Sequence, residues 1–232
     1  MFATIVNAAA VVVGSIIGLF LRRGLSKRYE EAIYTAAGLV SLVIGIQMAL
    51  KTTHILAFAF ALILGGLVGT LLDVEGAVMR LGEGLKRRFA AKEEGGNFAL
   101  GFLNASVLYC SGAMAIVGSF KAGTEGDYAL ILTKSVLDGF LSILFASAMG
   151  VGVAFAALSV FVYQGALTLL SVWVKPYVSD LMLAELTGLG GALVIMIGIS
   201  LLGLKKLKTG DFLPGLVFTV LFVLAMPYAA FL

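Results

Sequence analysis

One uninterrupted apolar run limits what this chain can fold into more than any other feature. Residues 139–174, GFLSILFASAMGVGVAFAALSVFVYQGALTLLSVWV, are 36 residues without a single charged side chain. As one helix they would extend roughly 54 Å, whereas crossing the ~30 Å hydrocarbon core of a bilayer takes roughly 20 residues. The block from 129 to 174 therefore predicts two spans, joined by a turn at the Met-Gly-Val-Gly stretch of residues 149–152.

The composition agrees with a membrane protein. Hydrophobic residues make up 61% of the chain and charged residues 12%, whereas soluble domains are about half apolar and about a quarter charged. The apolar stretches lack the polar alternation of a transmembrane barrel, so the predicted fold class is an all-α integral membrane protein with an eight-helix transmembrane bundle. The remaining predicted spans are about 2–21, 32–50, 55–72, 98–120, 184–204 and 212–232.

The basic residues predict the orientation of the bundle. With eight spans and the N-terminus outside, twelve of the sixteen Lys and Arg residues fall in cytoplasmic segments, as the positive-inside rule requires. They are Arg22, Arg23, Lys27, Arg28, Arg80, Lys86, Arg87, Arg88, Lys92, Lys205, Lys206 and Lys208. A seven-span count would place the last three outside, so we expect eight spans, a retained first span, and both termini outside.

The chain also aligns with itself at an offset of 153 residues. Ile44-Gly45-Ile46 lies over Ile197-Gly198-Ile199, and Gly38 lies over Gly191. Spans one to three thus resemble spans six to eight, and the odd number of spans between their starts predicts copies inverted across the membrane. Inverted repeats are typical of secondary transporters. Chance similarity between apolar segments is the alternative.

We therefore interpret residues 1–232 as a single transmembrane domain in four parts. These are repeat A (1–72), a cytoplasmic basic loop (73–97), central spans (98–149) and repeat B (150–232). Apolar residues recur within the loop at the spacing of an amphipathic helix on the membrane surface, which leaves two interpretations open: such a helix, or an ordinary basic loop that determines topology. The recurring residues are Val74, Val78, Leu81, Leu85 and Phe89.

Lys134 and Asp138 are the principal candidates for chemistry. Their spacing of four residues places them on one helix face within reach of each other. If the span begins near Leu130, Asp138 lies roughly 12 Å below the membrane surface, where a charge needs a partner or a wet cavity. Asp138 would bind a cation or proton with Lys134 as its displaced partner, or the two would form a static ion pair.

A second candidate is the small-residue run CSGAMAIVGS at 110–119, which includes Ser111, Gly112 and Ser119. Close packing of one continuous helix is the favoured interpretation. The alternative is a helix broken at Ser111-Gly112 whose free backbone groups face a substrate. Uncharged polar residues within spans, Asn7, Gln47, Asn104 and Gln164, could bond a neighbouring helix or line a path.

Two acidic residues at predicted span ends, Asp73 and Glu185, are expected to be solvated. There is no P-loop, no HExxH and no GxSxG motif, and the single histidine, His54, falls in a predicted outside loop. The single cysteine, Cys110, excludes a multi-cysteine metal site. We therefore expect no enzyme activity, no cofactor, no metal and no nucleic-acid partner.

Several runs resemble one bacterial family along most of the chain. MFATIVNAAAVVVGSIIGLFLRRGL, CSGAMAIVGS, TKSVLDGFLSILFAS and VYQGALTLL are similar to the YqgA/YdfK-like membrane proteins, domain of unknown function 554. The resemblance implies a multi-pass protein of the cytoplasmic (inner) membrane of a prokaryote and implies no activity. It also implies that Lys134, Asp138, Gln164 and the 110–119 run belong to the family's recurring pattern.

The sequence therefore predicts a secondary transporter or channel-like permease for a small polar solute or ion, working by alternating access between inverted repeats. Its candidate binding residues are Asn7, Asn104, Ser111, Gly112, Ser119, Lys134, Asp138 and Gln164. The alternative is a non-transporting scaffold or regulator that docks a partner through the 73–97 loop. The expected partners are the solute or ion and the lipid bilayer, and a homo-oligomer is compatible with the sequence.

Overall fold

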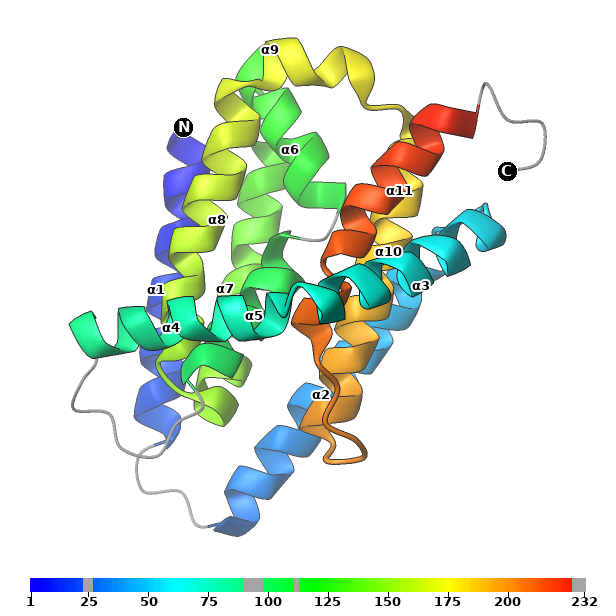
Figure 1. The fold of residues 1–232 in the computed structure, drawn as a ribbon. Helices are drawn as coiled ribbons and strands as arrows, with labels where there is room; N and C mark the ends of the chain where they lie inside the picture. The colour runs from blue at the N-terminus through cyan, green and yellow to red at the C-terminus, as the bar shows by residue number, and fades with distance from the viewer. Residues whose placement is uncertain (23–26, 90–97, 111–112, 227–232) are drawn as a thin grey trace.

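In the computed structural model the described residues are 1–22, 27–89, 98–110 and 113–226. They form helices joined by short connections, with no strand among them (Figure 1). The elements are α1 (Phe2–Arg22), α2 (Lys27–Ala49), α3 (Ile55–Leu71), α4 (Val74–Phe89), α5 (Phe98–Cys110), α6 (Ala113–Thr124), α7 (Ala129–Met149), α8 (Gly152–Leu169), α9 (Ser171–Val174), η1 (Lys175–Tyr177), α10 (Asp180–Leu201), η2 (Thr209–Phe212) and α11 (Pro214–Ala225).

The helices confirm the predicted all-helical membrane architecture with a smaller number of full-length spans. Within the described residues, α1, α2, α7, α8 and α10 are each long and apolar enough to cross a membrane. Two bent pairs, α3 with α4 at 59° and α5 with α6 at 60°, raise the number of candidate spans from five to seven at most. The predicted span 212–232 contains α11, which has only 12 residues between Pro214 and Ala225.

The long apolar run forms two helices, with the turn where its glycines predict it. Helix α7 ends at Met149 and α8 begins at Gly152. Between them Gly150 has φ 88°, a left-handed conformation that glycine adopts without steric cost. Gly152 allows the turn to press against α5, because a Cβ there would lie 2.0 Å from the carbonyl oxygen of Phe98.

The helices form two groups that lie side by side in Figure 1. We call α1, α5, α6, α7 and α8 the first bundle, and α2, α3, α10 and α11 the second bundle. The end that carries Met1 and α9 is the N-terminal face, and the end that carries the α7–α8 turn is the turn face.

In the first bundle, glycines bring α1 and α7 into backbone contact. A Cβ on Gly14 would lie 2.1 Å from the carbonyl oxygen of Gly139, and a Cβ on Gly18 would lie 2.3 Å from that of Ile143. Since both residue numbers increase together, the two helices run parallel. Close approach of this kind increases van der Waals contact where lipid offers no hydrophobic driving force.

In the second bundle, glycines pair α2 with α10 in the antiparallel sense. A Cβ on Gly38 would lie 3.1 Å from the carbonyl oxygen of Gly198, and one on Gly45 would lie 2.9 Å from that of Gly191. Helices α3 and α11 also run antiparallel. A Cβ on Gly65 would lie 2.4 Å from the backbone of Gly215.

Helix α4 lies across the long helices toward the turn face (Figure 1). It is the amphipathic helix considered for the basic loop, and it packs on α5. Its first turn is joined to η2 by reciprocal hydrogen bonds. The Glu75 N–H donates to Asp211 Oδ1 at 2.9 Å, and the Gly210 N–H donates to Glu75 Oε2 at 2.8 Å.

Candidate functional site

Helix α7 places Lys134 and Asp138 inside the protein. Its buried face follows the helical period through Ile131, Lys134, Asp138 and Ser142. The opposite face exposes large apolar residues such as Phe140, which is 70% exposed. Both charged residues are only 5% exposed, so the pair faces the interior of the first bundle and not lipid.

The pair is part of a network that joins three helices. Lys134 Nζ donates to Asp138 Oδ2. From α1, Asn7 Nδ2 donates to the same carboxylate oxygen at 3.0 Å and to Gln164 Oε1 of α8 at 3.1 Å. Asn7 and Gln164 are fully buried. The structure therefore brings together four of the residues that the sequence predicts as site residues.

The end of α5 completes the surroundings of the pair. Tyr109 Oη and Ser142 Oγ are hydrogen-bonded at 2.7 Å, and Lys134 Nζ lies 5.8 Å from the centroid of the Tyr109 ring. Tyr109 is in the last turn of α5, where the partial negative charge of the helix end favours a cation. Sequence reasoning missed this hydroxyl pair. The spacing of Ser142, four residues after Asp138, was the available signal.

The small-residue run ends α5 and begins α6. Helix α5 stops at Cys110 and α6 starts at Ala113, with their axes 60° apart. The angle is incompatible with one straight helix running through both segments. Ser111 and Gly112 lie outside the described residues. Ser119 is fully buried on α6, and its hydroxyl has no hydrogen-bond partner among the described residues.

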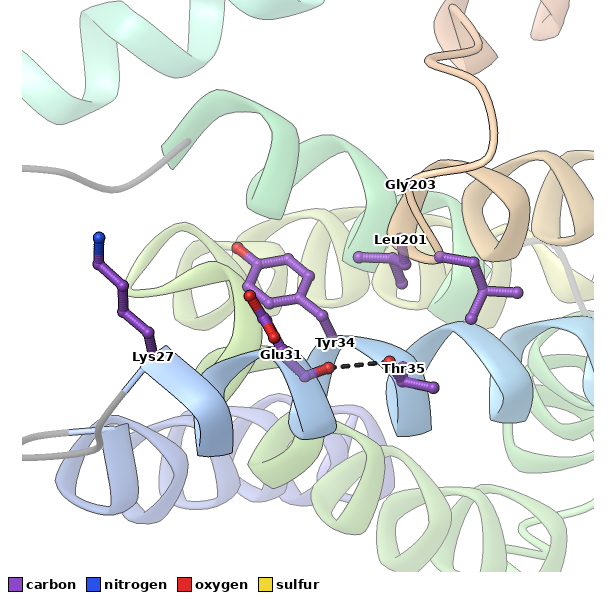
Figure 2. Close-up of a pocket in the computed structure, with 7 residues that line it drawn as sticks. Lys27, Glu31, Tyr34, Thr35, Leu201 and Gly203 are labelled. Atoms are coloured by element: carbon purple, nitrogen blue, oxygen red, sulfur yellow. Dashed lines mark hydrogen bonds between the residues drawn. The ribbon is translucent and has the colours of Figure 1, made fainter.

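Asn104 lies apart from the network, in a cavity between the two bundles. Its Nδ2 is 3.8 Å from Met149 Sδ, and it lines a cavity of about 440 Å³ with Tyr34, Ser200 and Thr209. A second cavity of about 510 Å³ shares Tyr34 and Leu201 with the first and extends along α2 toward Lys27. Figure 2 shows the Tyr34 ring beside Glu31, with Leu201 facing both from across the cavity.

The expectation that Glu185 is solvated is wrong. Glu185 is 2% exposed, on the second turn of α10, and its carboxylate binds the loop that precedes α3. It accepts hydrogen bonds from the Thr53 N–H at 2.7 Å, the Thr53 hydroxyl at 2.9 Å and the His54 N–H at 3.0 Å, and also from the Thr52 hydroxyl. Asp73, by contrast, is exposed as expected. The available signal was a run of hydrogen-bond donors, Thr-Thr-His, in the preceding loop.

A Glu185→Ala variant should lose stability, because the carboxylate accepts several hydrogen bonds from the loop before α3 and lies 3.4 Å from His54 Nδ1. The substitution would leave the Thr53 and His54 amides, in the loop before α3, without an acceptor. Hydrogen bonds to a charged group contribute about 1.5–3 kcal/mol each and buried donors are costly to leave unpaired, so we expect a loss of about 3 kcal/mol. Thermal unfolding in detergent would measure it, with Asp180→Ala on the exposed first turn of α10 as the control. Equal melting temperatures for the two variants would contradict this role.

Comparison with known proteins identifies relatives along the whole chain. The family model described as "Protein of unknown function (DUF554)" matches residues 2–224. The chain is 34% identical to the "Uncharacterized membrane protein YdfK" of Bacillus subtilis (strain 168), with 97% of each chain covered. It is 28% identical to the "Uncharacterized protein YqgA" of Escherichia coli (strain K12), covering 97% of this chain and 94% of that protein. No solved structure matches it.

Proposed function

The chain belongs to the DUF554 family of proteins of unknown function, and we propose that it is a secondary transporter or channel-like permease for a small polar solute or ion. The observation that carries the proposal is the Lys134–Asp138 pair enclosed with Asn7 and Gln164 between α1, α7 and α8. Ionisable residues inside membrane bundles are costly and mark ion or substrate pathways.

The unused hydrogen-bonding capacity of this network favours a working site over a static ion pair. Asn7 Oδ1 and Gln164 Nε2 have no partner among the described residues. A buried polar network that serves only stability is expected to be fully satisfied. Groups left free next to a charged pair can instead bind a cation, a proton-carrying water or a polar solute during a transport cycle.

Contacts between helices support the inverted repeat. Each predicted helix of repeat A packs on its counterpart in repeat B: α1 on α8, α2 on α10, and α3 on α11. Within α2 and α10, Gly38 approaches Gly198 while Gly45 approaches Gly191. At an offset of 153 residues, Gly191 is the counterpart of Gly38 and Gly198 is the counterpart of Gly45. Exchanging the two repeats therefore turns the Gly38–Gly198 contact into the Gly45–Gly191 contact. Such self-complementary exchange is what a two-fold axis produces.

In the proposed architecture eight spans cross the cytoplasmic membrane of a prokaryote. Seven of them are the candidate spans described above, carried by α1, α2, α3, the bent pair α5–α6, α7, α8 and α10, and the eighth is the shorter apolar helix α11. Both termini then lie outside, and α4 lies on the basic cytoplasmic side with the 205–208 loop, in keeping with the positive-inside rule.

The two bundles are the bodies that would move against each other. Cavities lie in the seam between them near both faces, one of about 440 Å³ beside Met149 at the turn face and one of about 380 Å³ beside Tyr177 at the N-terminal face. Rocking of the second bundle against the first would open these cavities in turn, and because each bundle contains helices of both repeats, the moving bodies in this proposal are the bundles and not the repeats.

Flux measurements in proteoliposomes test the proposal. Vesicles loaded with the pH dye pyranine would receive, one at a time, gradients of protons, sodium, potassium, chloride and neutral or acidic amino acids. We expect at least one gradient to drive a dye response or radiotracer uptake that empty vesicles lack. Absence of protein-dependent flux under every gradient would refute a transport function.

The exposed, basic side of α4 favours one rival function, a scaffold that docks a partner. Arg80 and Arg87 are exposed on this helix. Deletion of residues 80–94 separates the two functions, because a transporter should retain its flux whereas a scaffold should lose its partner. If the deletion abolishes partner capture and no flux is found in the full chain, the scaffold function replaces the transporter.

A further inference from the structure

Buried polar atoms without partners gather on one side of Asp138. Seven buried side-chain nitrogen or oxygen atoms in the described residues have no hydrogen-bond partner. Six of them belong to residues of α1, α6, α8 and α9 that lie level with Asp138 or nearer the N-terminal face. These six residues are Thr4, Asn7, Ser119, Gln164, Thr168 and Ser171, and we call them the polar column. The seventh, Ser15, lies toward the turn face.

Helix register aligns α1 and α8 within the polar column. The Asn7–Gln164 hydrogen bond sets these antiparallel helices level with each other. Thr4 and Thr168 lie one turn nearer the N-terminal face. Thr4 precedes Asn7 by three residues and therefore shares its face of α1, and Thr168 follows Gln164 by four residues and therefore shares its face of α8. Thr4 is 1% exposed and Thr168 is 6% exposed.

Helix α6 covers the outer end of the polar column. A Cβ on Gly123 would lie 2.2 Å from Ser171 Oγ and 2.3 Å from the carbonyl oxygen of Thr168. Ser119 is one turn deeper than Gly123 on the same face of α6. Beyond Ser171 the surface carries the Lys175–Glu125 ion pair at 2.7 Å, in which the hydrogen bond from Lys175 lowers the pKa of the Glu125 carboxyl.

The opposite side of Asp138 is mostly apolar in the described residues, with Ser15 as its one buried hydroxyl without a partner. Toward the turn face, Val11, Phe145 and Val153 are fully buried. The Ser142 hydroxyl there is already paired with Tyr109. Among the described residues, most of the buried polar groups without partners therefore lie on the side of Asp138 that faces the N-terminal face.

The distance between successive polar groups of the polar column matches the spacing of hydrogen-bonded water molecules in a single chain. One helical turn rises about 5.4 Å, close to twice the ~2.8 Å length of an O–H···O hydrogen bond. One water can therefore bridge the polar groups of successive turns. Buried groups without protein partners are normally satisfied by such waters. Hydroxyls and amides both donate and accept, as the relay of a proton requires.

We propose that the polar column holds a chain of water that carries protons between the N-terminal face and the Asp138 carboxylate, so that the proton is the coupling ion. The inference rests on the proposed transport function. A hydronium ion at the N-terminal face donates a proton to the first water of the chain, and the proton is passed from water to water. The Asp138 carboxylate accepts it and becomes a neutral carboxylic acid. Lys134 then loses its counter-ion, and reversal of the step restores the pair.

The neighbourhood of Asp138 favours a proton over a metal cation. The Lys134 ammonium already occupies the cation position beside the carboxylate. Among the described residues, the other titratable groups near the pair are Tyr109 on α5 and the next residue, Cys110, which interacts electrostatically with both charges. Helices α1 and α8 contribute only the uncharged amides of Asn7 and Gln164.

Two measurements test the proposal. In a Cys110→Ala background, a water-soluble methanethiosulfonate reagent applied from the N-terminal face should label Thr168→Cys and should leave Phe145→Cys unlabelled. In pyranine-loaded proteoliposomes, the isosteric double variant Thr4→Val/Thr168→Val should lose most of its protein-dependent proton uptake. Thr219→Val is the matched control, because this buried Thr in the second bundle bonds the carbonyl of Gly215 and lies outside the polar column.

The outcomes separate this inference from the proposed function. Labelling of Thr168→Cys together with loss of proton uptake in the double variant supports the water path. The water path is refuted if solute flux needs no proton gradient. It is also refuted if the double variant keeps its proton uptake and Thr168→Cys is not labelled. Neither result would refute the transport function. Absence of any flux in the unaltered chain overturns the transport function, and with it proton coupling.

Discussion

An Asp138→Asn variant is expected to lose coupled transport together with part of its stability. Asparagine has nearly the same shape as aspartate but removes the charge that Lys134 faces, and the Lys134 side chain is only 7% exposed. Removing one partner of a buried ion pair costs about 3–5 kcal/mol because the other charge stays buried and uncompensated. Flux in proteoliposomes and thermal unfolding in detergent measure the two losses separately.

The double variant Lys134→Met/Asp138→Asn distinguishes a working site from a static ion pair. Replacing both charges of a buried pair by neutral groups is often neutral, or stabilising by about 1–4 kcal/mol. The double variant should therefore regain most of the stability that Asp138→Asn loses. If the pair takes part in transport, this folded protein stays inactive. Flux equal to that of the unaltered chain would show that the pair is structural only.

An exposed ion pair provides the control for these variants. Lys121 and Asp127 lie 3.7 Å apart at the N-terminal face, and each side chain is 42% exposed. Surface pairs contribute about 0–1 kcal/mol to stability. The variant Lys121→Gln/Asp127→Asn should therefore change neither the melting temperature nor the flux by much.

A Gly14→Ala variant is expected to separate α1 from α7 and to destabilise the whole first bundle. The added methyl would lie 2.1 Å from the carbonyl oxygen of Gly139 and 2.9 Å from its carbonyl carbon. Backbone atoms cannot yield as side chains do, so the helices must move apart, and overpacking of a core costs about 1–3 kcal/mol or more. Asn7 would move away from Asp138 with the rest of α1, so flux should fall together with the melting temperature.

The same chemical change on the facing helix is the matched control. A methyl at Gly139 would lie 3.4 Å from the nearest atom, the carbonyl oxygen of Ala10, which is an ordinary contact. Alanine is also favoured over glycine within a helix by about 1 kcal/mol. Gly139→Ala should therefore be as stable as the unaltered chain or more so. Equal stability of the two variants would contradict the α1–α7 crossing described above.

Features that depend on local composition could be predicted from the sequence. The 36-residue uncharged run was too long for one span and carried glycines at its middle, so the α7–α8 turn is where its residues predict it. The four-residue spacing of Lys134 and Asp138 likewise predicted their hydrogen bond, since helix geometry alone brings such side chains together.

Features that depend on which helices meet could not be predicted. Glu185 was expected in solvent because it stands near a span end, yet its partners lie more than 130 positions earlier in the chain. The cavity lined by Tyr34 and Asn104 arises in the same way from residues distant in sequence.

The sequence by itself therefore determined that the chain is a bundle of membrane helices, where one tight turn lies, and that one of its helices carries a charged pair. Hydrophobic length and helical periodicity are properties of neighbouring residues, and they suffice for those conclusions. Only the tertiary structure decided that Asn7 and Gln164 join Asp138 and that unpaired hydroxyls line one side of it. The register between helices is set by long-range contacts, here between glycine backbones, and no local pattern encodes it.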